Sequence, residues 1–374
     1  MSAAATAPND ELDLAQWIRL TQTHGIGAIT AQHLLAGFGL PAAVFSASAA
    51  ALAAVVGTAI ARELTRPVSS GLHNLIARTL DWCRQPGNHV LTLADPRYPP
   101  ALLTIPDPPI LLYAKGRLDL LRQRCVGVVG SRNATVQGIT NAETFAEALS
   151  QAGLTVVSGM ALGIDAAAHV GALRHVGSGA TIAVIGTGQD IVYPARNRAL
   201  AHRIASEGCI VSEYALGTPA VAANFPRRNR LISGLACGVL VVEAAEKSGS
   251  LITARVAADQ GRDVFAIPGS IHSPLSKGCH VLIKQGAKLV ESAQDILEEI
   301  SVGERNTPSA SMPVVLAQPC HSVLYDLLGF DPVDGDTLAA LSGLDAAALA
   351  TQLLELELQG LLEVLPGGAY RRLG

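Results

Sequence analysis

The 374-residue sequence has few aromatic residues, little charge and no long apolar run. Phe, Trp and Tyr make up 4% of the chain, which favours packed helices over an aromatic-rich β architecture. No apolar run approaches the roughly 18 residues that a membrane span needs. Residues 1–10 lack the basic and apolar regions of a signal peptide. We therefore expect a cytoplasmic protein that has no membrane partner.

The sequence also lacks the residue spacings of metal and dinucleotide sites. Its six cysteines form no Cys-x-x-Cys pair, and no histidine lies at ligand spacing from a carboxylate or a cysteine. There is no Gly-x-Gly-x-x-Gly loop of the kind that binds a dinucleotide. The sequence therefore predicts reduced cysteines and neither a metal nor a cofactor.

Positive charge is scarce as well. The formal net charge is −4 and the isoelectric point is about 6.2, which argues against a protein that coats DNA by bulk charge. A local basic groove is still compatible with this balance, because salt screens the field of surface charges within roughly 8–10 Å.

Residues 1–85 carry helical apolar patterns and are expected to form an all-α domain. The segment His24-Gly25-Ile26-Gly27 separates two of these helices and resembles the turn of a helix-hairpin-helix or SAM-like domain. Its amides would face a DNA phosphate in one interpretation. In the other, which we favour, it is a tight turn that needs both glycines for positive φ. No Lys or Arg lies between Arg19 and Arg62 to attract a phosphate.

Strands and helices are expected to alternate between Cys125 and residue 300, after a proline-rich extended connector that starts at residue 86. Short unalternating β-branched runs indicate parallel strands buried on both faces. The fold class is therefore α/β, a Rossmann-like, doubly wound, mostly parallel sheet in a domain over 86–300. The expected strands are Cys125–Val129, Leu154–Val157, Thr181–Ile185, Cys209–Val211, Val239–Val242 and Val264–Ile267. The expected helices are Asn141–Ala152, Asp165–His175, Arg196–Ser206, Arg228–Ala236, Ile252–Gln260 and Ser276–Gln285.

Residues 301–320 have the composition of a linker, and residues 321–374 form a separate unit. Three helical segments and a glycine-tipped hairpin in this unit resemble a winged-helix domain. Its recognition helix would be Asp345–Gln359, with Asp345 or the preceding turn as the N-cap. This helix has Glu355 and Glu357 and no basic residue, which favours a protein contact or a structural role over DNA reading.

The loops after the expected strands are rich in glycine and hydroxyl side chains. Ligands of open parallel sheets bind beyond the carboxyl ends of the strands, where glycine exposes backbone amides and helix N-termini attract anions. These loops therefore predict an anion-binding rim. Glycine is also common in ordinary tight turns, but that alternative does not account for the arginine and the hydroxyls. The rim residues are Gly130, Ser131, Arg132, Ser158, Gly159, Gly163, Ser248, Gly249, Ser250 and Thr253.

The segment Phe225–Arg230 concentrates positive charge that is rare elsewhere. Arg227, Arg228 and Arg230 lie with Asn229 near an expected helix N-terminus, where basic residues oppose the helix dipole. We interpret this as a site where a bound anion compensates the charge, with Phe225 stacked on a base. A solvated turn with Phe225 in the core is the alternative.

No catalytic group of residues stands out. Asp165 and His169 are spaced for a structural hydrogen bond on one helix face. The one candidate acid pair is Glu213 and Glu243, which follow successive strands and would face one pocket.

Several of these segments together resemble the DprA (Smf) DNA-processing family. They are Ser158–Asp165 with His169, Phe225–Arg230, Ser248–Ala254, Pro268-Gly269 and Tyr98-Pro99. The resemblance implies a non-catalytic recombination mediator, which binds and protects incoming single-stranded DNA during natural transformation and loads the RecA recombinase on it. It also implies a homodimer through the Rossmann-like domain. By the same resemblance, Ser131, Arg132 and the three arginines contact phosphate, and the glycine and serine loops shape the pocket.

Two other functions fit the fold. One is a nucleotide-processing enzyme of the lysine-decarboxylase-like phosphoribohydrolase group, although the sequence has no Pro-Gly-Gly-x-Gly-Thr loop. The other is a nicotinamide or flavin protein, against which the missing glycine fingerprint argues.

Overall fold

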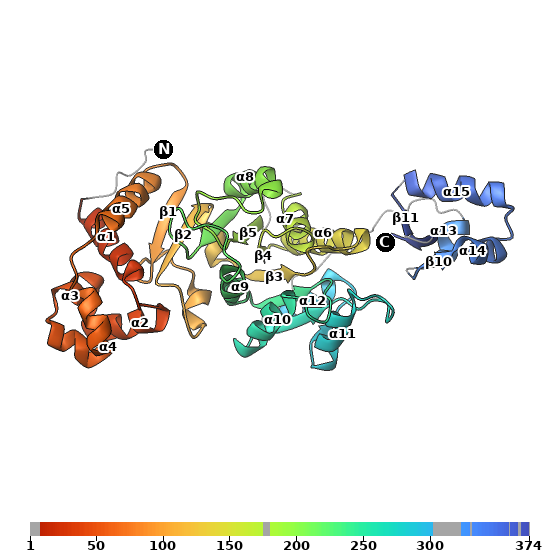
Figure 1. Cartoon of the computed structure of the whole chain (residues 1–374). Coiled ribbons are helices and arrows are strands. Elements are labelled where there is room, and N and C mark those ends of the chain that lie inside the picture. Colours follow the sequence, from red (N-terminus) through yellow and green to blue (C-terminus); the bar gives the residue numbers. More distant parts are fainter. Residues whose placement is uncertain are drawn as a thin grey trace.

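The computed structural model describes residues 8–174, 180–301, 323–329, 331–358, 360–365 and 368–373. N-terminal helices, a central sheet with helices on both faces and a small C-terminal unit follow one another along the chain (Figure 1). Of the predicted linker 301–320, only Ser301 is among the described residues.

From residue 8 on, the N-terminal unit consists of five helices, as expected from the apolar patterns. Trp17, Ile18 and Leu34 are at most 2% exposed and lie in its core. In the predicted hairpin turn only Gly25 has positive φ, at +83°, whereas Gly27 is extended and caps the second helix. The expectation that both glycines need positive φ was therefore wrong. The helices are α1 Pro8–Gln22, α2 Ala28–Phe38, α3 Pro41–Ser46, α4 Ala49–Leu64 and α5 Ser70–Cys83.

The proline-rich segment is more than an extended connector. It contains two 3₁₀ turns, Pro100–Thr104 and Leu118–Arg122, and the strands β1 (Asn88–Thr92) and β2 (Leu111–Gly116), which pair with each other antiparallel. The six prolines from Pro96 to Pro109 lie between the two strands, where no ladder hydrogen bond is lost. Tyr113 of β2 is buried against the N-terminal helices, and this packing joins the two units.

The six expected parallel strands are all present, with ends shifted by at most about one residue. Within the described residues the sheet has nine strands in the order β1-β2-β6-β5-β4-β3-β7-β8-β9, and only the β1–β2 and β2–β6 pairs among them are antiparallel. The pattern missed the two-residue strand β9 (Lys288–Leu289), which forms one edge. The remaining strands are β3 Cys125–Val129, β4 Thr155–Ser158, β5 Ala180–Val184, β6 Cys209–Ser212, β7 Gly238–Val241 and β8 Asp263–Ala266.

Helices cover both faces of the sheet, as a doubly wound fold requires (Figure 1). On one face the core includes Phe145, Ala168 and Ile296, from α6 (Val136–Gln151), α7 (Ile164–Ala172) and α12 (Ala293–Ser301). On the other it includes residues of α9 (Asn224–Leu235), α10 (Ser250–Asp259) and α11 (Lys277–Lys284). Helix α8 (Arg198–Glu207) packs beside α7.

The chain reverses its direction across the sheet between β3 and β7. Strands β3 to β6 are added in sequence order towards one edge, and the chain then returns to place β7 on the other side of β3. In doubly wound sheets, such a switch point opens a crevice at the carboxyl ends of the two strands. The fold therefore places a candidate site where β3 and β7 end.

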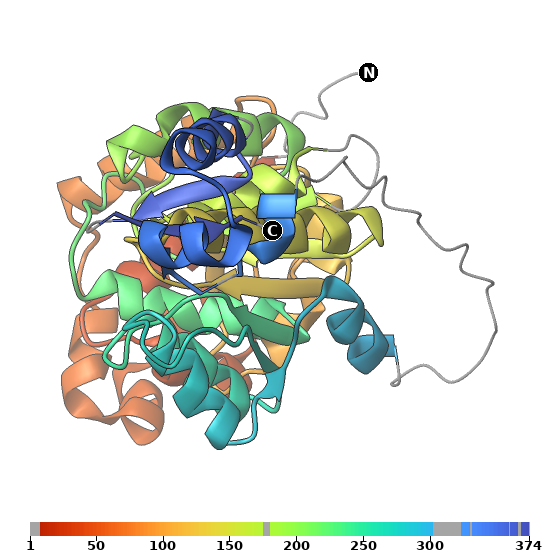
Figure 2. The same ribbon diagram turned by 90° about the vertical axis from the view of Figure 1, so that its right-hand side faces the viewer.

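The C-terminal unit, which is nearest the viewer in Figure 2, has the predicted winged-helix elements. Asp345 caps the expected recognition helix, because its carboxylate accepts a 2.8 Å hydrogen bond from the Ala348 amide. Within the described ranges, no single helix is long and apolar enough to cross a membrane. The bent pair α14–α15 meets that test by length and composition only. The elements are α13 Val323–Leu327, β10 Val333–Asp334, α14 Gly335–Ser342, α15 Ala346–Leu358, β11 Leu362–Leu365 and β12 Ala369–Arg372.

Candidate nucleic-acid interface

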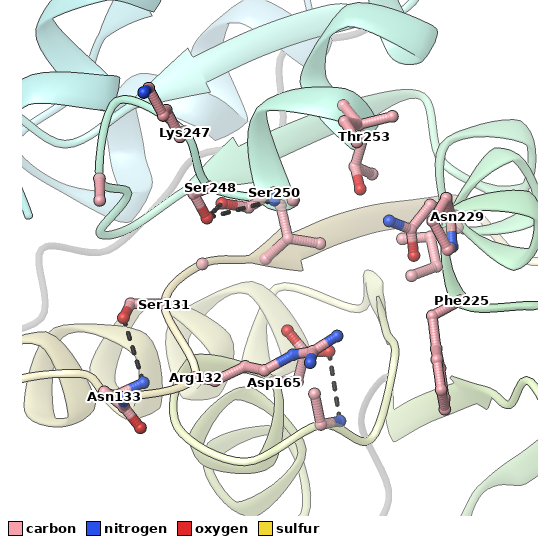
Figure 3. A pocket seen from close by; sticks show the side chains of 18 of the residues that line it. Ser131, Arg132, Asn133, Asp165, Phe225, Asn229, Lys247, Ser248, Ser250 and Thr253 are labelled. Carbon is pink, nitrogen blue, oxygen red and sulfur yellow. Dashed lines mark hydrogen bonds between the residues drawn. The ribbon is translucent and has the colours of Figure 1, made fainter. Parts of the chain in front are cut away.

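A cavity of about 540 Å³ lies at the switch point, between the loops that follow β3 and β7 (Figure 3). Of the predicted residues, the structure brings together ten around this cavity: Gly130, Ser131, Arg132, Phe225, Arg228, Asn229, Ser248, Gly249, Ser250 and Thr253. The other five do not line it: Ser158, Gly159, Gly163, Arg227 and Arg230.

The loop after β3 forms one wall and is held from both sides. The Ser131 amide donates a 2.7 Å hydrogen bond to the Glu243 carbonyl, and the Ser131 carbonyl accepts one of 3.1 Å from Ile164. A Cβ at Gly130 would lie 2.6 Å from Ile164, so only glycine fits this close approach. With its backbone fixed in this way, the loop leaves the Arg132 side chain exposed at the cavity rim.

The loop after β7 and the start of α10 form the opposite wall. The Ser248 and Ser250 hydroxyls are hydrogen-bonded to each other at 2.7 Å, and the space around Gly249 is open. Thr253 lies one turn further along the helix and is 1% exposed. Amides at a helix N-terminus carry partial positive charge, so this wall suits an anion.

Three polar residues of the cavity were missed by the sequence interpretation. Asn133, Asp165 and the exposed Lys247 all line it. Lys247 carried a usable signal, since it directly precedes the predicted Ser248 loop in a chain with little positive charge. Asp165 was missed because its spacing from His169 indicates a structural hydrogen bond between the two residues.

Arg228 lines the cavity but is 4% exposed, and it binds the protein itself. Its Nη1 donates a 2.6 Å hydrogen bond to the Gly159 carbonyl and another to the Val184 carbonyl. Burial lowers the pKa of Arg228 to about 10, and the charge of nearby Asp165 opposes this shift. Burial likewise raises the pKa of Asp165, against the effect of Arg228. The two residues therefore stabilise each other's charge beneath the cavity.

Arg230 is also compensated from inside the protein. Its guanidinium is 2.5 Å from Glu213 and 3.0 Å from Asp107, and its side chain is 9% exposed. The expectation that a bound anion must balance this charge is thus wrong for Arg230, because the fold supplies carboxylates that are distant in sequence. Arg227 is different, since its side chain is 58% exposed and lies 3.9 Å from Glu213. The helix also begins at Asn224, earlier than predicted, with Pro226 in its first turn.

The two acids of the enzyme hypothesis have structural partners and do not line the cavity. Glu213 pairs with Arg230. The Glu243 carboxylate accepts hydrogen bonds from the amide (3.0 Å) and the hydroxyl (2.6 Å) of Thr135, the N-cap of α6. The expectation that Glu213 and Glu243 face one pocket is therefore wrong.

The Ser158–Asp165 loop supports the cavity from beneath. The buried Ser158 hydroxyl donates a 2.7 Å hydrogen bond to the Val128 carbonyl. A Cβ at Gly159 would collide with the Arg228 guanidinium, and one at Gly163 would collide with the Ser131 carbonyl. Gly163 also has a φ of +74°, which strongly favours glycine.

The spacing of Asp165 and His169 indicates a hydrogen bond between them, but His169 bonds a different residue. Its Nδ1 is 2.7 Å from the Thr181 hydroxyl, which itself donates to the Val156 carbonyl, so Nδ1 is the donor. Burial lowers the pKa of His169 to about 3, which keeps the ring neutral. Among the described residues, no group of three or more His, Cys, Asp or Glu side chains is placed to hold a metal ion. The five cysteines among them are free, and Cys320 lies outside them.

Comparison with known proteins identifies the family. The family model described as "DNA recombination-mediator protein A" matches residues 89–301. The chain belongs to this family. The family's "DprA winged helix domain" matches residues 308–368, which confirms the predicted winged-helix fold at the C-terminus.

Relatives and solved structures agree with this assignment. Protein Smf of Escherichia coli is 42% identical over 304 residues, 79% of this chain and 80% of that protein. DNA processing protein DprA of Streptococcus pneumoniae is 50% identical over 208 residues, 56% of this chain and 73% of its own. The solved structure of the pneumococcal protein has a TM-score of 0.66 at 38% identity and covers 76% of this chain and 97% of that one. A Helicobacter pylori DprA structure, described for its single-stranded DNA binding mode, has a TM-score of 0.52 at 30% identity and covers 57% and 97%.

Proposed function

We propose that this protein binds single-stranded DNA at the cavity between β3 and β7. The observation that carries the proposal is the convergence of Arg132, Lys247 and the N-terminal turn of α10 around one cavity, with the Phe225 ring at its edge (Figure 3). Phosphates suit the cations and the positive end of a helix dipole, and a ring suits a base. The Helicobacter pylori protein named for such binding shares this fold and family, which supports the proposal.

Fewer positively charged side chains are available to bind DNA than the sequence indicated. Arg228 and Arg230 are buried and bonded within the protein, so Arg132, Arg227 and Lys247 remain as exposed cations. Few phosphate contacts mean weak binding by each protomer. A dimer that places two cavities on one strand would raise the overall affinity through a high effective concentration.

Titration of a labelled oligo-dT against salt tests this function. Arg132→Ala is expected to weaken binding and to reduce the slope of log affinity against log salt by about 0.7, the value for one lost contact with a single strand. Arg62→Ala removes the same charge from a distant exposed position on α4 and serves as the control. Binding that ignores ionic strength, or that Arg132→Ala leaves unchanged, contradicts the proposal.

The proposal includes dimerisation through the Rossmann-like domain. Its support is the edge strand β9, whose Leu289 is 45% exposed and lines a second cavity of about 560 Å³ together with Ile271, which is 65% exposed. Exposed edges and apolar patches favour pairing with another chain. Leu289→Glu is expected to produce a monomer in sedimentation experiments and to weaken oligonucleotide binding. A monomeric wild type would contradict this part.

We further propose, from the family, that the bound strand is passed to RecA during natural transformation. On single strands already coated with a single-strand-binding protein, the protein should shorten the lag before RecA hydrolyses ATP. Arg132→Ala should lose this effect, because the protein must first hold the strand. An unchanged lag in the presence of wild-type protein would contradict RecA loading, whereas the proposal of DNA binding would still stand.

A further inference from the structure

We propose that the single strand continues beyond the cavity along a track formed by Phe225, Tyr193, Arg196 and Arg198, here called the Tyr193 track. A base stacks on Tyr193, and the two arginines pair with the adjoining phosphates. This inference rests on the proposed function and extends it to residues outside the cavity. It also defines the path of the strand over the protein, which runs from the carboxyl ends of β3 and β7 towards α8.

The aromatic part of the track begins at the cavity rim. The Arg132 guanidinium carbon lies 5.9 Å from the Phe225 ring centroid, and the Phe225 and Tyr193 centroids are 5.5 Å apart with the rings tilted by 34°. At this distance the rings already contact each other, so the outer surface of Tyr193 is the one open to a base. In the described part of the chain, Tyr193 is the only aromatic residue among the exposed large hydrophobic side chains, at 50% exposure.

The basic part of the track follows Tyr193 directly in sequence. Arg196 and Arg198 are exposed, and three peptide links place the Cα atom of Arg196 within about 11 Å of that of Tyr193. Neither guanidinium has an ion pair or side-chain hydrogen bond with any residue that the structure describes.

These arginines stand at the start of α8, whose first turn has no acidic residue. Basic side chains oppose the dipole at that end of a helix. In α9 a carboxylate relieves the same conflict, since Glu213 lies 3.9 Å from Arg227 in the first turn and also pairs with Arg230. At α8 the described chain supplies no such carboxylate, so a phosphate is the group that completes the site.

The track is held rigidly relative to the cavity. Asn197 lies between the two arginines and is 8% exposed. Its amide nitrogen donates to the Met160 carbonyl at 2.9 Å and to the Ala161 carbonyl at 3.2 Å, and Ala161 lines the cavity. Tyr193 lies in the loop over residues 187–197. At the start of this loop, the Thr187 hydroxyl donates a 2.8 Å hydrogen bond to the Ile191 carbonyl. A strand bound in the cavity therefore meets a preformed surface, which reduces the ordering cost of binding.

Oligonucleotide length separates the track from the cavity. Site sizes of single-strand binders run from roughly 4 to 16 nucleotides, so we compare oligo-dT of about 4 and about 20 nucleotides. Tyr193→Ala should weaken binding of the long oligonucleotide at least about fivefold, the equivalent of one lost stacking contact, and leave the short one unchanged. Arg196→Ala with Arg198→Ala should reduce the salt slope for the long oligonucleotide by about 1.4, twice the value for one contact.

Two matched variants test the chemistry. Tyr193→Phe keeps the stacking ring and should bind like wild type, whereas Arg62→Ala should leave the salt slope unchanged. A 2-aminopurine in the long oligonucleotide should be quenched by wild-type protein at one or two positions, and Tyr193→Ala should abolish that quenching.

The inference and the proposed function fail in different ways. If Arg132→Ala weakens binding but Tyr193→Ala and the double arginine variant bind the long oligonucleotide like wild type, the Tyr193 track is wrong and the cavity function stands. If Tyr193→Phe is as weak as Tyr193→Ala, stacking is wrong. If wild-type protein binds neither oligonucleotide, the proposed function fails and the track with it.

Discussion

Arg228 Nη1 donates a 2.6 Å hydrogen bond to the carbonyl oxygen of Gly159, 69 residues earlier in the chain. This bond ties the first turns of α9 to the loop that leads into α7, and it runs beneath the cavity. Three arginines that are close in sequence thus have three environments: Arg228 supports the cavity, Arg230 is held by two carboxylates and Arg227 faces solvent.

The first prediction separates support from binding in this segment. Arg228→Ala should lower the free energy of unfolding by about 3 kcal/mol, because it leaves buried carbonyls and the Asp165 carboxylate without their charged partner. Arg227→Ala should change stability by less than about 0.5 kcal/mol and reduce the salt slope of DNA binding by about 0.7. Urea unfolding and oligo-dT titration measure the two effects. Equal stability of both variants would show that Arg228 has no supporting role.

Glu243 is expected to matter for stability. Glu243→Gln should cost about 1–3 kcal/mol, since an amide cannot accept both hydrogen bonds from Thr135 and has no charge to favour the N-terminus of α6. Thermal unfolding measures the loss. Glu298→Gln changes an exposed glutamate in the same way and should have little effect. Release of a free base from nucleoside monophosphates, lost in Glu243→Gln, would instead restore the enzyme hypothesis.

His169 should make the protein sensitive to acid. Its pKa falls from an ordinary 6.5 to about 3 in the folded state. Between these values the unfolded chain binds the proton and the folded chain does not, so stability falls as the pH drops, by up to about 1.4 kcal/mol per pH unit. His169→Asn keeps a donor for Thr181 but does not titrate, so its stability should depend less steeply on pH from 6.5 to 4. Parallel curves for variant and wild type would contradict this prediction.

An unfavourable backbone conformation alone costs about 1–3 kcal/mol. Gly163→Ala should lower the free energy of unfolding by more than that. A side chain there combines an unfavourable φ of +74° with a collision against the Ser131 carbonyl. Gly249→Ala, in open space on the opposite wall, is the matched control and should unfold like wild type. A small loss at Gly163 would mean that the loop after β3 moves easily, and the cavity wall would then not be preformed.

The sequence by itself determined the parallel strands, the flanking helices, the winged helix and the family, because these depend on local periodicity and on long contiguous motifs. It also placed ten of the twenty residues that line the cavity, since the carboxyl ends of parallel strands share one edge. Only the tertiary structure decided which charges are available to a ligand. Glu213 and Asp107 reach Arg230 from distant segments, and Glu243 turns to Thr135. The hydrophobic pattern also missed β1, β2 and β9. Prolines separate β1 from β2 in the sequence and β9 has only two residues, so pairing with neighbouring strands decides that these segments are strands. A pattern records which residues can be buried, whereas the residues that face one another across the fold determine which charges are paired and which remain free to bind.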